Sequence, residues 1–311
     1  MERVLVTGGA GFIGSHIVEA LLTRGDSVRV LDNYSTGRRE NLSGYEERIQ
    51  VIEGDLRDPL AISHAVRDID LIFHQAAFIS VPQSMLEPET CFAVNVQGTV
   101  MLLEAARKSG VRKVVLASST AVYGNCENVP VSEDEPLAPV SPYAVSKQVD
   151  ELLASLYSSS YSLPVVALRY FNVFGPRQRP DSDYAAAIPI FFNQMLSNQP
   201  VTIYGDGRQS RDFIYVKDVV RANLQAAEAD IGGEVFNVCT GIESSLLDLL
   251  ETISGLSPIA LEVRFEPPRH GDIYRSAGNP ERAASRLGFR AASTLADGLQ
   301  ETLQWMRNEP S

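Results

Sequence analysis

The sequence predicts an α/β protein in which a doubly wound parallel sheet carries a smaller C-terminal lobe. Short apolar runs alternate with longer amphipathic segments through the first half of the chain, which is typical of strands that alternate with helices. A glycine-rich turn follows the first apolar run and opens the first amphipathic segment. Strands are expected at residues 3–7, 27–31, 49–53, 70–74, 113–118 and 165–170, and helices at 12–24 and 98–109.

The second half of the chain has a different composition. Its loops are dense in Pro, Gly, Arg and Asp around residues 176–183, 206–212 and 266–272. We therefore expect residues 1–174 to form a nucleotide-binding, Rossmann-type domain and residues 175–311 to form a substrate-binding lobe. A strand near residues 235–238 is expected to rejoin the main sheet. Ligands of open α/β sheets bind beyond the carboxyl ends of the strands, so loops of the lobe should close over that edge.

Composition excludes several classes of partner and site. The chain has 311 residues, of which 44% are hydrophobic, enough for a sizeable core, and a net charge of -12 disfavours nucleic acid and anionic membrane. Cys91, Cys126 and Cys239 are far apart and lack metal-ligand spacing, so we expect no disulfide framework, no metal and a cytoplasmic location. No apolar stretch approaches ~18 residues and no signal peptide is evident, so no membrane span is expected.

The glycine turn points to a dinucleotide. It reads Thr7-Gly8-Gly9-Ala10-Gly11-Phe12-Ile13-Gly14. Glycines at 8, 11 and 14 permit a tight turn, close approach of the backbone to a diphosphate, and packing of the helix on the strand. The N-terminus of the helix then supplies N–H donors and the positive end of its dipole.

Residues at the ends of the next strands refine the cofactor to NAD. A carboxylate at Asp32 can accept the adenosine ribose hydroxyls and repel a 2′-phosphate, which favours NAD over NADP. Arg38 and Arg39 follow closely and could host a phosphate, so NADP stays open. Further candidates are Asp55 and Leu56 beside the adenine, and Gln75, Ala76 and Ala77 beside the phosphates and ribose. His74 is interpreted as a core histidine because its neighbours are apolar.

A second group of residues suggests acid–base chemistry. Tyr143 and Lys147 are four residues apart in a predicted helix and therefore share one face. A nearby ammonium and a positive nicotinamide ring both favour the phenolate, so the pair can act as general acid and base. Ser118 and Ser119 end the fifth predicted strand, where the crevice should be. The hydroxyl of Ser119 could bond the reacting oxygen, or the run could be a helix cap.

Together these motifs resemble the UDP-glucose 4-epimerase group of the extended short-chain dehydrogenases. The likeness covers the glycine turn, Asp32, Ser119-Thr120-Ala121-Val122-Tyr123-Gly124, Tyr143 with Lys147, and Arg169-Tyr170-Phe171-Asn172. It implies tightly held NAD and inversion of C4 of a UDP-hexose through a 4-keto sugar, with Tyr143 as proton shuttle supported by Lys147 and Ser119. It also implies a homodimer.

The resemblance implies further contacts. For NAD these are Gly8, Gly11, Phe12, Ile13, Gly14, Asp32, Asn33, Thr36, Gly37, Asp55, Leu56, Gln75, Ala76, Ala77, Asn95, Tyr143, Lys147 and Tyr170. For the UDP-sugar they are Ser80, Ser118, Ser119, Tyr143, Asn172, Gln178, Ile188, Pro189, Thr202, Tyr204, Arg211, Arg269, Asp272 and Ser276. Gly278-Asn279 departs from the pattern, where relatives usually have Ala-Asp.

Three alternatives stay open. Related 4,6-dehydratases and decarboxylases resemble one another in carrying Glu two positions before the tyrosine of Val-Tyr-Gly, whereas this chain has Thr120-Ala121 there. A UDP-glucuronate 4-epimerase and a non-catalytic NAD-binding regulator are the other two alternatives.

The sugar preference has its own sequence signals. Ser80–Ser84, Arg177-Gln178 and Ser276 resemble the subgroup that acts on UDP-N-acetylglucosamine, because a small residue at 276 leaves room for an acetamido group. UDP-glucose would still fit such a site.

Overall fold

A seven-stranded sheet forms the centre of the molecule. The structure, a computed structural model, describes residues 1–126, 128–179, 187–257, 261–268 and 273–308. The strand order is β11-β6-β5-β4-β1-β2-β3, and every neighbouring pair is parallel. The strands are β1 (Arg3–Thr7), β2 (Ser27–Asp32), β3 (Ile49–Glu53), β4 (Leu71–His74), β5 (Lys113–Ser119), β6 (Val165–Tyr170) and β11 (Val235–Val238). The predicted doubly wound α/β fold is confirmed.

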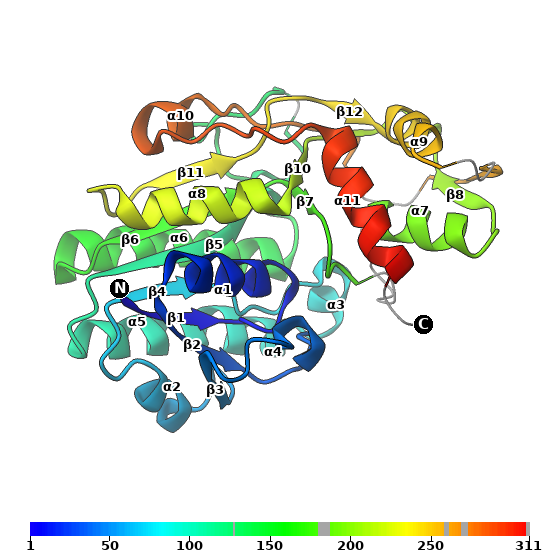
Figure 1. The fold of residues 1–311 in the computed structure, drawn as a ribbon. Coiled ribbons are helices and arrows are strands. Elements are labelled where there is room, and N and C mark those ends of the chain that lie inside the picture. Colours follow the sequence, from blue (N-terminus) through cyan, green and yellow to red (C-terminus); the bar gives the residue numbers. More distant parts are fainter. Residues whose placement is uncertain (127, 180–186, 258–260, 269–272, 309–311) are drawn as a thin grey trace.

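Helices cover both faces of this sheet (Figure 1). One face carries α1 (Phe12–Arg24) and α8 (Val216–Glu228), and the other carries α2 (Pro59–Ala65), α5 (Gly98–Lys108) and α6 (Pro142–Tyr161). Successive strand residues point to opposite faces, so Val4 and Val6 enter the core beneath α1 and α8 while Leu5 enters the other. No helix in the described ranges has both the length and the apolarity needed to cross a bilayer.

The predicted strands and helices agree closely with the observed ones. Three strand boundaries and one helix boundary differ by a single residue. The crossover between β4 and β5 contains more helices than the one predicted at 98–109. Helix α3 (Val81–Leu86), helix α4 (Pro88–Phe92) and a π-helical turn at Ala93–Gln97 precede α5. Short 3₁₀ turns occupy Arg39–Leu42 and Thr120–Tyr123.

Residues after 175 contribute to both parts of the molecule. β11 pairs in parallel with β6, as the sequence predicts for residues 235–238, and α8 packs beside α1. α10 (Glu281–Leu287) lies against β11 and α8. A division at residues 174 and 175 is therefore only an approximate description of the chain, and that boundary stays a prediction.

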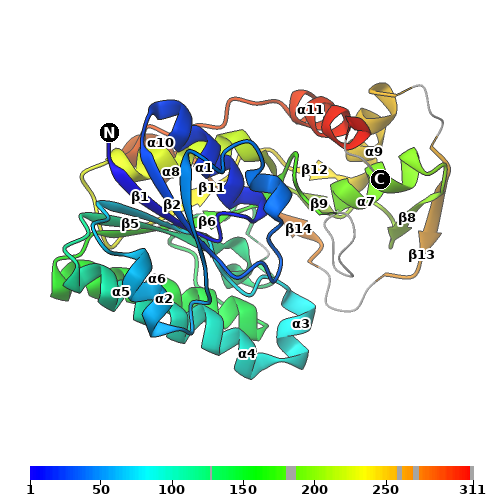
Figure 2. The ribbon, with the colours of Figure 1, turned by 60° about the horizontal axis from the view of Figure 1, so that its bottom comes forward.

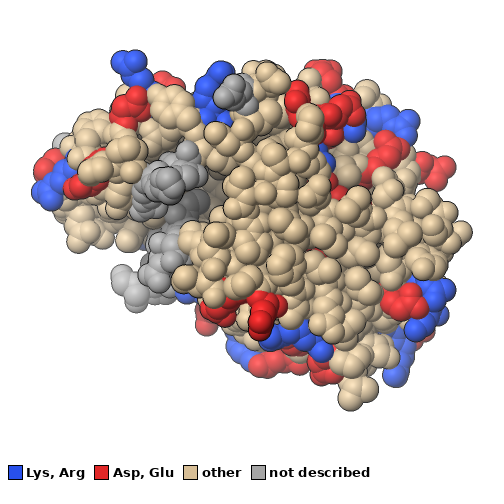
Figure 3. All heavy atoms as spheres, turned by 180° about the vertical axis from the view of Figure 1, so that it is seen from behind, with Lys and Arg blue, Asp and Glu red and all other residues tan. Residues whose placement is uncertain are grey.

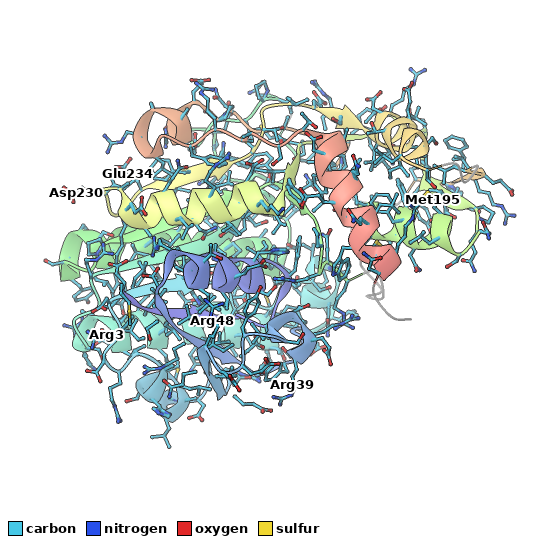
Figure 4. All side chains as sticks on the ribbon, viewed as in Figure 1. Arg3, Arg39, Arg48, Met195, Asp230 and Glu234 are labelled. Atoms are coloured by element: carbon cyan, nitrogen blue, oxygen red, sulfur yellow. The ribbon has the colours of Figure 1, made fainter. Side chains whose placement is uncertain are left out.

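A smaller lobe lies beyond the carboxyl ends of the strands (Figure 2). Its core gathers residues from α7 (Ala187–Leu196), α9 (Leu246–Gly255) and α11 (Leu295–Asn308), and Met195 of α7 lies within it (Figure 4). The remaining short strands are β7 (Asn172–Phe174), β8 (Val201–Tyr204), β9 (Ser210–Arg211), β10 (Phe213–Tyr215), β12 (Ser244–Ser245), β13 (Val263–Glu266) and β14 (Arg275–Ser276).

The direction of chain winding reverses at β1. The chain runs from β1 outward through β2 to β3, then crosses to β4 on the other side of β1 and continues through β5 and β6. A crevice therefore opens between the carboxyl ends of β1 and β4, where ligands of such sheets bind. Thr7 and His74 end these two strands and are paired in register.

Candidate functional site

The glycine turn brings two backbones unusually close. Gly8 has φ +68°, and a Cβ added there would lie 2.7 Å from the Ala76 nitrogen. A Cβ at Gly14 would lie 2.1 Å from the Gly8 oxygen. Only glycine fits these positions, as the motif requires. Among the described residues no side chain caps the N-terminus of α1, so its N–H donors stay available to a ligand.

A cavity of about 490 Å³ opens beside this turn. Nearly all the residues predicted to bind the cofactor line it, together with several that the sequence did not single out. The predicted ones are Gly8, Gly11, Phe12, Ile13, Gly14, Asp32, Asn33, Thr36, Gly37, Asp55, Leu56, Gln75, Ala76, Ala77, Tyr143, Lys147 and Tyr170. The carboxyl ends of β1, β2 and β4 thus meet at one cavity, where a dinucleotide would lie across the switch point.

Asn95 is the predicted cofactor residue that does not line the cavity. It is 1% exposed and lies in the π-helical turn behind the wall. Its amide donates to the Phe78 carbonyl oxygen at 3.1 Å and to Ser146 Oγ at 2.9 Å, and its Oδ1 accepts from the Phe78 nitrogen at 2.7 Å. Asn95 therefore fixes the segment that follows β4 to helix α6.

Asp32 is held rigidly at the end of β2. Its Oδ2 accepts from the Ala10 nitrogen at 2.9 Å and its Oδ1 accepts from the Tyr34 nitrogen at 2.8 Å. Burial raises the pKa of Asp32, and these two N–H donors oppose that rise. The guanidinium of Arg39 pairs with Glu53 at 2.6 Å and lies over the Tyr34 ring. Arg39 is therefore engaged outside the cavity.

Helix α6 presents the Tyr143 and Lys147 pair to the same cavity. Ser141 caps the helix by accepting from the Ala144 nitrogen, and Pro142 occupies the first turn. Lys147 is 3% exposed, and its Nζ donates to the Ala117 carbonyl at 3.0 Å and to Asp150 Oδ2 at 3.2 Å. The predicted side-by-side placement of the pair at the cavity wall is therefore observed.

The two serines at the end of β5 take different positions. Ser118 lines the cavity and donates to Glu151 Oε1. Ser119 Oγ accepts from the Ala121 nitrogen at 3.2 Å and caps the 3₁₀ turn, and Ser119 lines neither described cavity. Ser119 is therefore observed as a cap, which is one of the two interpretations of the serine run. The catalytic role of Ser119 stays a prediction.

His74 is a buried structural residue. Its ring nitrogens lie 2.7 Å from Thr7 Oγ1 and 3.0 Å from Thr99 Oγ1, and burial lowers the pKa of His74 to about 3. A neutral imidazole that is 2% exposed and bonded on both sides does not reach a ligand. The sequence interpretation of His74 agrees with this position.

A second cavity, of about 450 Å³, lies in the smaller lobe. Five predicted substrate residues line it: Asn172, Ile188, Thr202, Tyr204 and Arg211. Asn172 Nδ2 and Gln209 Oε1 are buried here without a hydrogen-bond partner among the described residues. Buried polar groups are normally paired, so these atoms point to a polar ligand.

The other predicted substrate residues are scattered. Pro189 is buried in α7, Ser80 caps α3, and Ser276 pairs in register with Arg211 at the edge of the lobe; none of the three lines either cavity. Gln178 lines the first cavity instead of the second. Arg269 and Asp272 fall outside the described residues.

The segment 175–179 crosses from the lobe to the cofactor cavity. His16 Nε2 bonds the Pro176 carbonyl at 2.9 Å, Arg177 pairs with Glu19 at 2.6 Å, and Arg179 reaches the Thr36 carbonyl at 3.5 Å. Arg177, Gln178 and Arg179 all line the cavity. Neither Arg177 nor Arg179 is among the residues predicted to bind the cofactor, and the density of Arg and Pro in this loop is the sequence signal for their position.

Comparisons with known proteins agree with this geometry. The model of the NAD dependent epimerase/dehydratase family matches residues 4–239. The UDP-glucose 4-epimerase of Mycolicibacterium smegmatis is 42% identical over 99% of both chains. The UDP-N-acetylglucosamine 4-epimerase from Methanobrevibacter ruminantium M1, solved with UDP-N-acetylmuramic acid, has a TM-score of 0.94 at 41% identity over 98% of both chains. The UDP-glucose 4-epimerase of Thermus thermophilus, solved as a complex with NAD, has a TM-score of 0.90 at 41% identity, covering 98% of this chain and 99% of that one.

More distant relatives carry out other reactions. A UDP-N-acetyl-α-D-glucosaminuronate decarboxylase from Bacillus cytotoxicus and a dTDP-glucose 4,6-dehydratase from an Actinoplanes species are each 34% identical over 98% of both chains. Overall similarity therefore does not by itself select the reaction. The residues around the two cavities must do so.

Asp32 provides a test of the cofactor end. Asp32→Ala removes a buried carboxylate from the cavity wall, so we expect NAD to bind about 10- to 100-fold more weakly and the preference for NAD over NADP to narrow. Affinities for both dinucleotides, and mass identification of cofactor that copurifies, measure this. Asp70→Ala is the control, because Asp70 pairs with Arg3 and lines neither cavity. Unchanged discrimination in the Asp32 variant would assign cofactor choice to other residues.

Proposed function

Because the chain belongs to the NAD dependent epimerase/dehydratase family, we propose that it is a UDP-hexose 4-epimerase that interconverts UDP-glucose and UDP-galactose and also UDP-N-acetylglucosamine and UDP-N-acetylgalactosamine. NAD is the cofactor of this family. The observation that carries the proposal is that Tyr143 and Lys147 line the cofactor cavity, while the carboxylates among its described lining residues, Asp32 and Asp55, lie at the ends of β2 and β3. The three cysteines are free, which fits the reducing cytoplasm that we propose as its location.

In the proposed reaction Tyr143 moves one proton in each direction. Bound NAD supplies the hydride acceptor at C4 of the sugar and later the hydride donor. The Tyr143 phenolate oxygen takes the proton of the C4 hydroxyl, which leaves a 4-keto sugar, and returns the proton after the sugar has turned its other face. The Lys147 ammonium stabilises the phenolate. Ser118 and Ser119, at the end of β5, are the candidates for binding the C4 oxygen.

Turning the sugar requires a fixed nucleotide and a loosely held ring. The unpartnered amide of Asn172 and the side-chain oxygen of Gln209 lie at the second cavity, and Arg211 lines it as well. Amide and guanidinium donors bind uracil carbonyl and diphosphate oxygens well. We propose that this cavity holds the UDP group and that the sugar extends from it towards Tyr143.

The lining carboxylates argue against the alternative lyase reactions. Among the described residues around the two cavities, the only carboxylates are Asp32 and Asp55, which lie at the ends of β2 and β3. Positions 120 and 121 are Thr and Ala. Among these described lining residues, elimination of water or loss of carbon dioxide would have no carboxyl partner beside Tyr143. Incubation with UDP-glucose, UDP-N-acetylglucosamine and UDP-glucuronate, followed by identification of products, separates all the alternatives; absence of any product would favour the non-catalytic regulator.

Tyr143 provides the test of the mechanism. Tyr143→Phe keeps the ring and removes the proton, so we expect epimerisation to fall by at least ~10²-fold while nucleotide binding and folding persist. Tyr161→Phe, at the exposed end of the same helix, should retain wild-type turnover. Near-normal turnover in the Tyr143 variant would exclude Tyr143 as the proton shuttle.

Ser276 provides the test of substrate range. The acetamido group at C2 sweeps more volume than a hydroxyl when the sugar turns, so Ser276→Tyr should penalise the acetylated substrate. Overpacking of about 1–3 kcal/mol corresponds to a change of about 5- to 150-fold in the ratio of kcat/KM for UDP-glucose to that for UDP-N-acetylglucosamine. Ser285→Tyr, on the exposed side of α10, is the control. An unchanged ratio would remove Ser276 from the sugar site.

We also propose that the protein is a homodimer. The back of the molecule, over α5 and α6, has a broad area almost free of charged side chains (Figure 3). Phe92 on α4 and Val100 on α5 are each 36% exposed. Leu152 and Leu156 on α6 are 65% and 45% exposed. A surface without charge can be self-complementary, as a two-fold interface requires.

The proposed dimer can be tested at this face. Replacing Leu152 and Leu156 together by Glu should convert a dimer into monomers, because burying two unpaired charges at an interface is unfavourable. Leu60→Glu, on exposed α2, should leave the dimer intact. Light scattering coupled to size exclusion measures both. A wild-type monomer at micromolar concentration would contradict the proposal.

A further inference from the structure

A buried carboxylate lies directly behind Lys147. Asp150, one turn further along α6, is 0% exposed, and its Oδ2 accepts from Lys147 Nζ at 3.2 Å. Its Oδ1 has no hydrogen-bond partner among the described residues. Placing a carboxylate with one unpaired oxygen in a protein interior is costly.

The contacts of Lys147 define which way its ammonium points. An ammonium has three N–H donors. One goes to the Ala117 carbonyl on β5, which lines the cavity, and one to Asp150 on α6, which is buried behind the cavity wall. The third donor is left for the cavity, where Tyr143 also lies. Two anchors on two different elements thus hold Nζ in place.

The surroundings of Asp150 make Lys147 its principal charge partner. Burial raises the pKa of Asp150 to about 6, and the Lys147 charge and the Thr99 hydroxyl oppose that rise. Glu151 adds a weaker rise in the same pKa, but the Arg169 guanidinium pairs with Glu151 at 2.7 Å. Cys91, and His74 held by Thr99, are the other titratable groups nearby; His74 is neutral, and burial raises the pKa of the Cys91 thiol. Above about pH 6 the carboxylate is therefore charged and faces one cation.

We propose that Asp150 is a positioning residue for the Tyr143 and Lys147 pair, which orients the ammonium and offsets part of its charge, and so sets the pH range in which Tyr143 can take a proton. The inference rests on the proposed function for its catalytic consequence. The electrostatic effect of Asp150 on Tyr143 and Lys147 does not depend on turnover. A carboxylate close to Nζ weakens the positive field at the phenol, and the same carboxylate strengthens proton binding by Lys147.

Removing the negative charge should therefore shift both titrations in one direction. In Asp150→Asn the shape is kept and the charge is lost, so the phenolate forms at lower pH and Lys147 loses its proton at lower pH. The whole profile of kcat against pH should move towards acid by about one pH unit. A purely structural role would lower kcat or stability without moving the profile.

A spectroscopic titration gives a readout that needs no turnover. The chain has eleven tyrosines, and subtracting the tyrosinate absorbance of Tyr143→Phe isolates the contribution of Tyr143. We expect the midpoint of that titration, in protein with its cofactor bound, to fall in Asp150→Asn and to stay at the wild-type value in Asp150→Glu, which retains the charge. Asp150→Ser is made in parallel as a second neutral replacement, in case the Asn variant does not fold.

Asp218→Asn is the matched control. Asp218 is also a buried carboxylate that pairs with a cation three residues along a helix, with Asp218 Oδ1 2.6 Å from Arg221. It holds the Ala292 and Ser293 nitrogens and does not line either cavity. Its replacement should leave both the profile and the Tyr143 midpoint in place.

The outcomes separate the two proposals. A midpoint and profile that stay in place in the folded neutral variants would overturn the role of Asp150, even if the wild type epimerises UDP-sugars. A midpoint that falls while the wild type shows no epimerisation would support the role of Asp150 and overturn the proposed function.

Discussion

The contact between the ends of β1 and β4 is the constraint on which the site depends. A Cβ on Gly8 would collide with the backbone of Ala76, and a Cβ on Gly14 would collide with the Gly8 carbonyl. This contact lets α1 begin directly at the crevice, with its N–H groups directed at the place where a diphosphate would lie. Every other functional group is positioned relative to that edge: Asp32 on one side, and Lys147 with Tyr143 on the other.

Behind the edge lies a connected set of buried polar groups. Glu151 accepts from Ser118 and from Arg169, and Arg169 also bonds Tyr123, which donates to Asn237. These bonds join β5, β6, β11 and α6. A buried network of this kind contributes little net stability, but breaking one member leaves its partner unpaired. Its effect is geometric, because the end of β5 and the helix that carries Tyr143 are held in one arrangement.

The sequence predicts the first half of the molecule well because its signals are local. Short apolar runs define strands such as 3–7, and glycines at 8 and 14 are required by close backbone contacts within the turn and with Ala76. Asn95 and Ser119 line neither cavity and bond neighbouring backbone, which no spacing reveals, so their predicted roles stay predictions. Arg177 and Arg179 reach the cavity from a loop whose path depends on packing between distant segments, so their position could not be inferred from the sequence pattern.

The segment 175–179 has a consequence for the supply of active protein. It is fastened to α1 by His16 and Glu19 and reaches across to Thr36, so the dinucleotide cavity is bounded by chain from both parts of the molecule. In the proposed reaction the cofactor returns to its starting state and needs no exchange, and chain that bounds the cavity from both parts of the molecule would slow exchange. Each molecule would then bind its dinucleotide once, near the time of its folding. Its lifetime output would depend on that single loading and not on the ratio of oxidised to reduced dinucleotide in the surrounding cell.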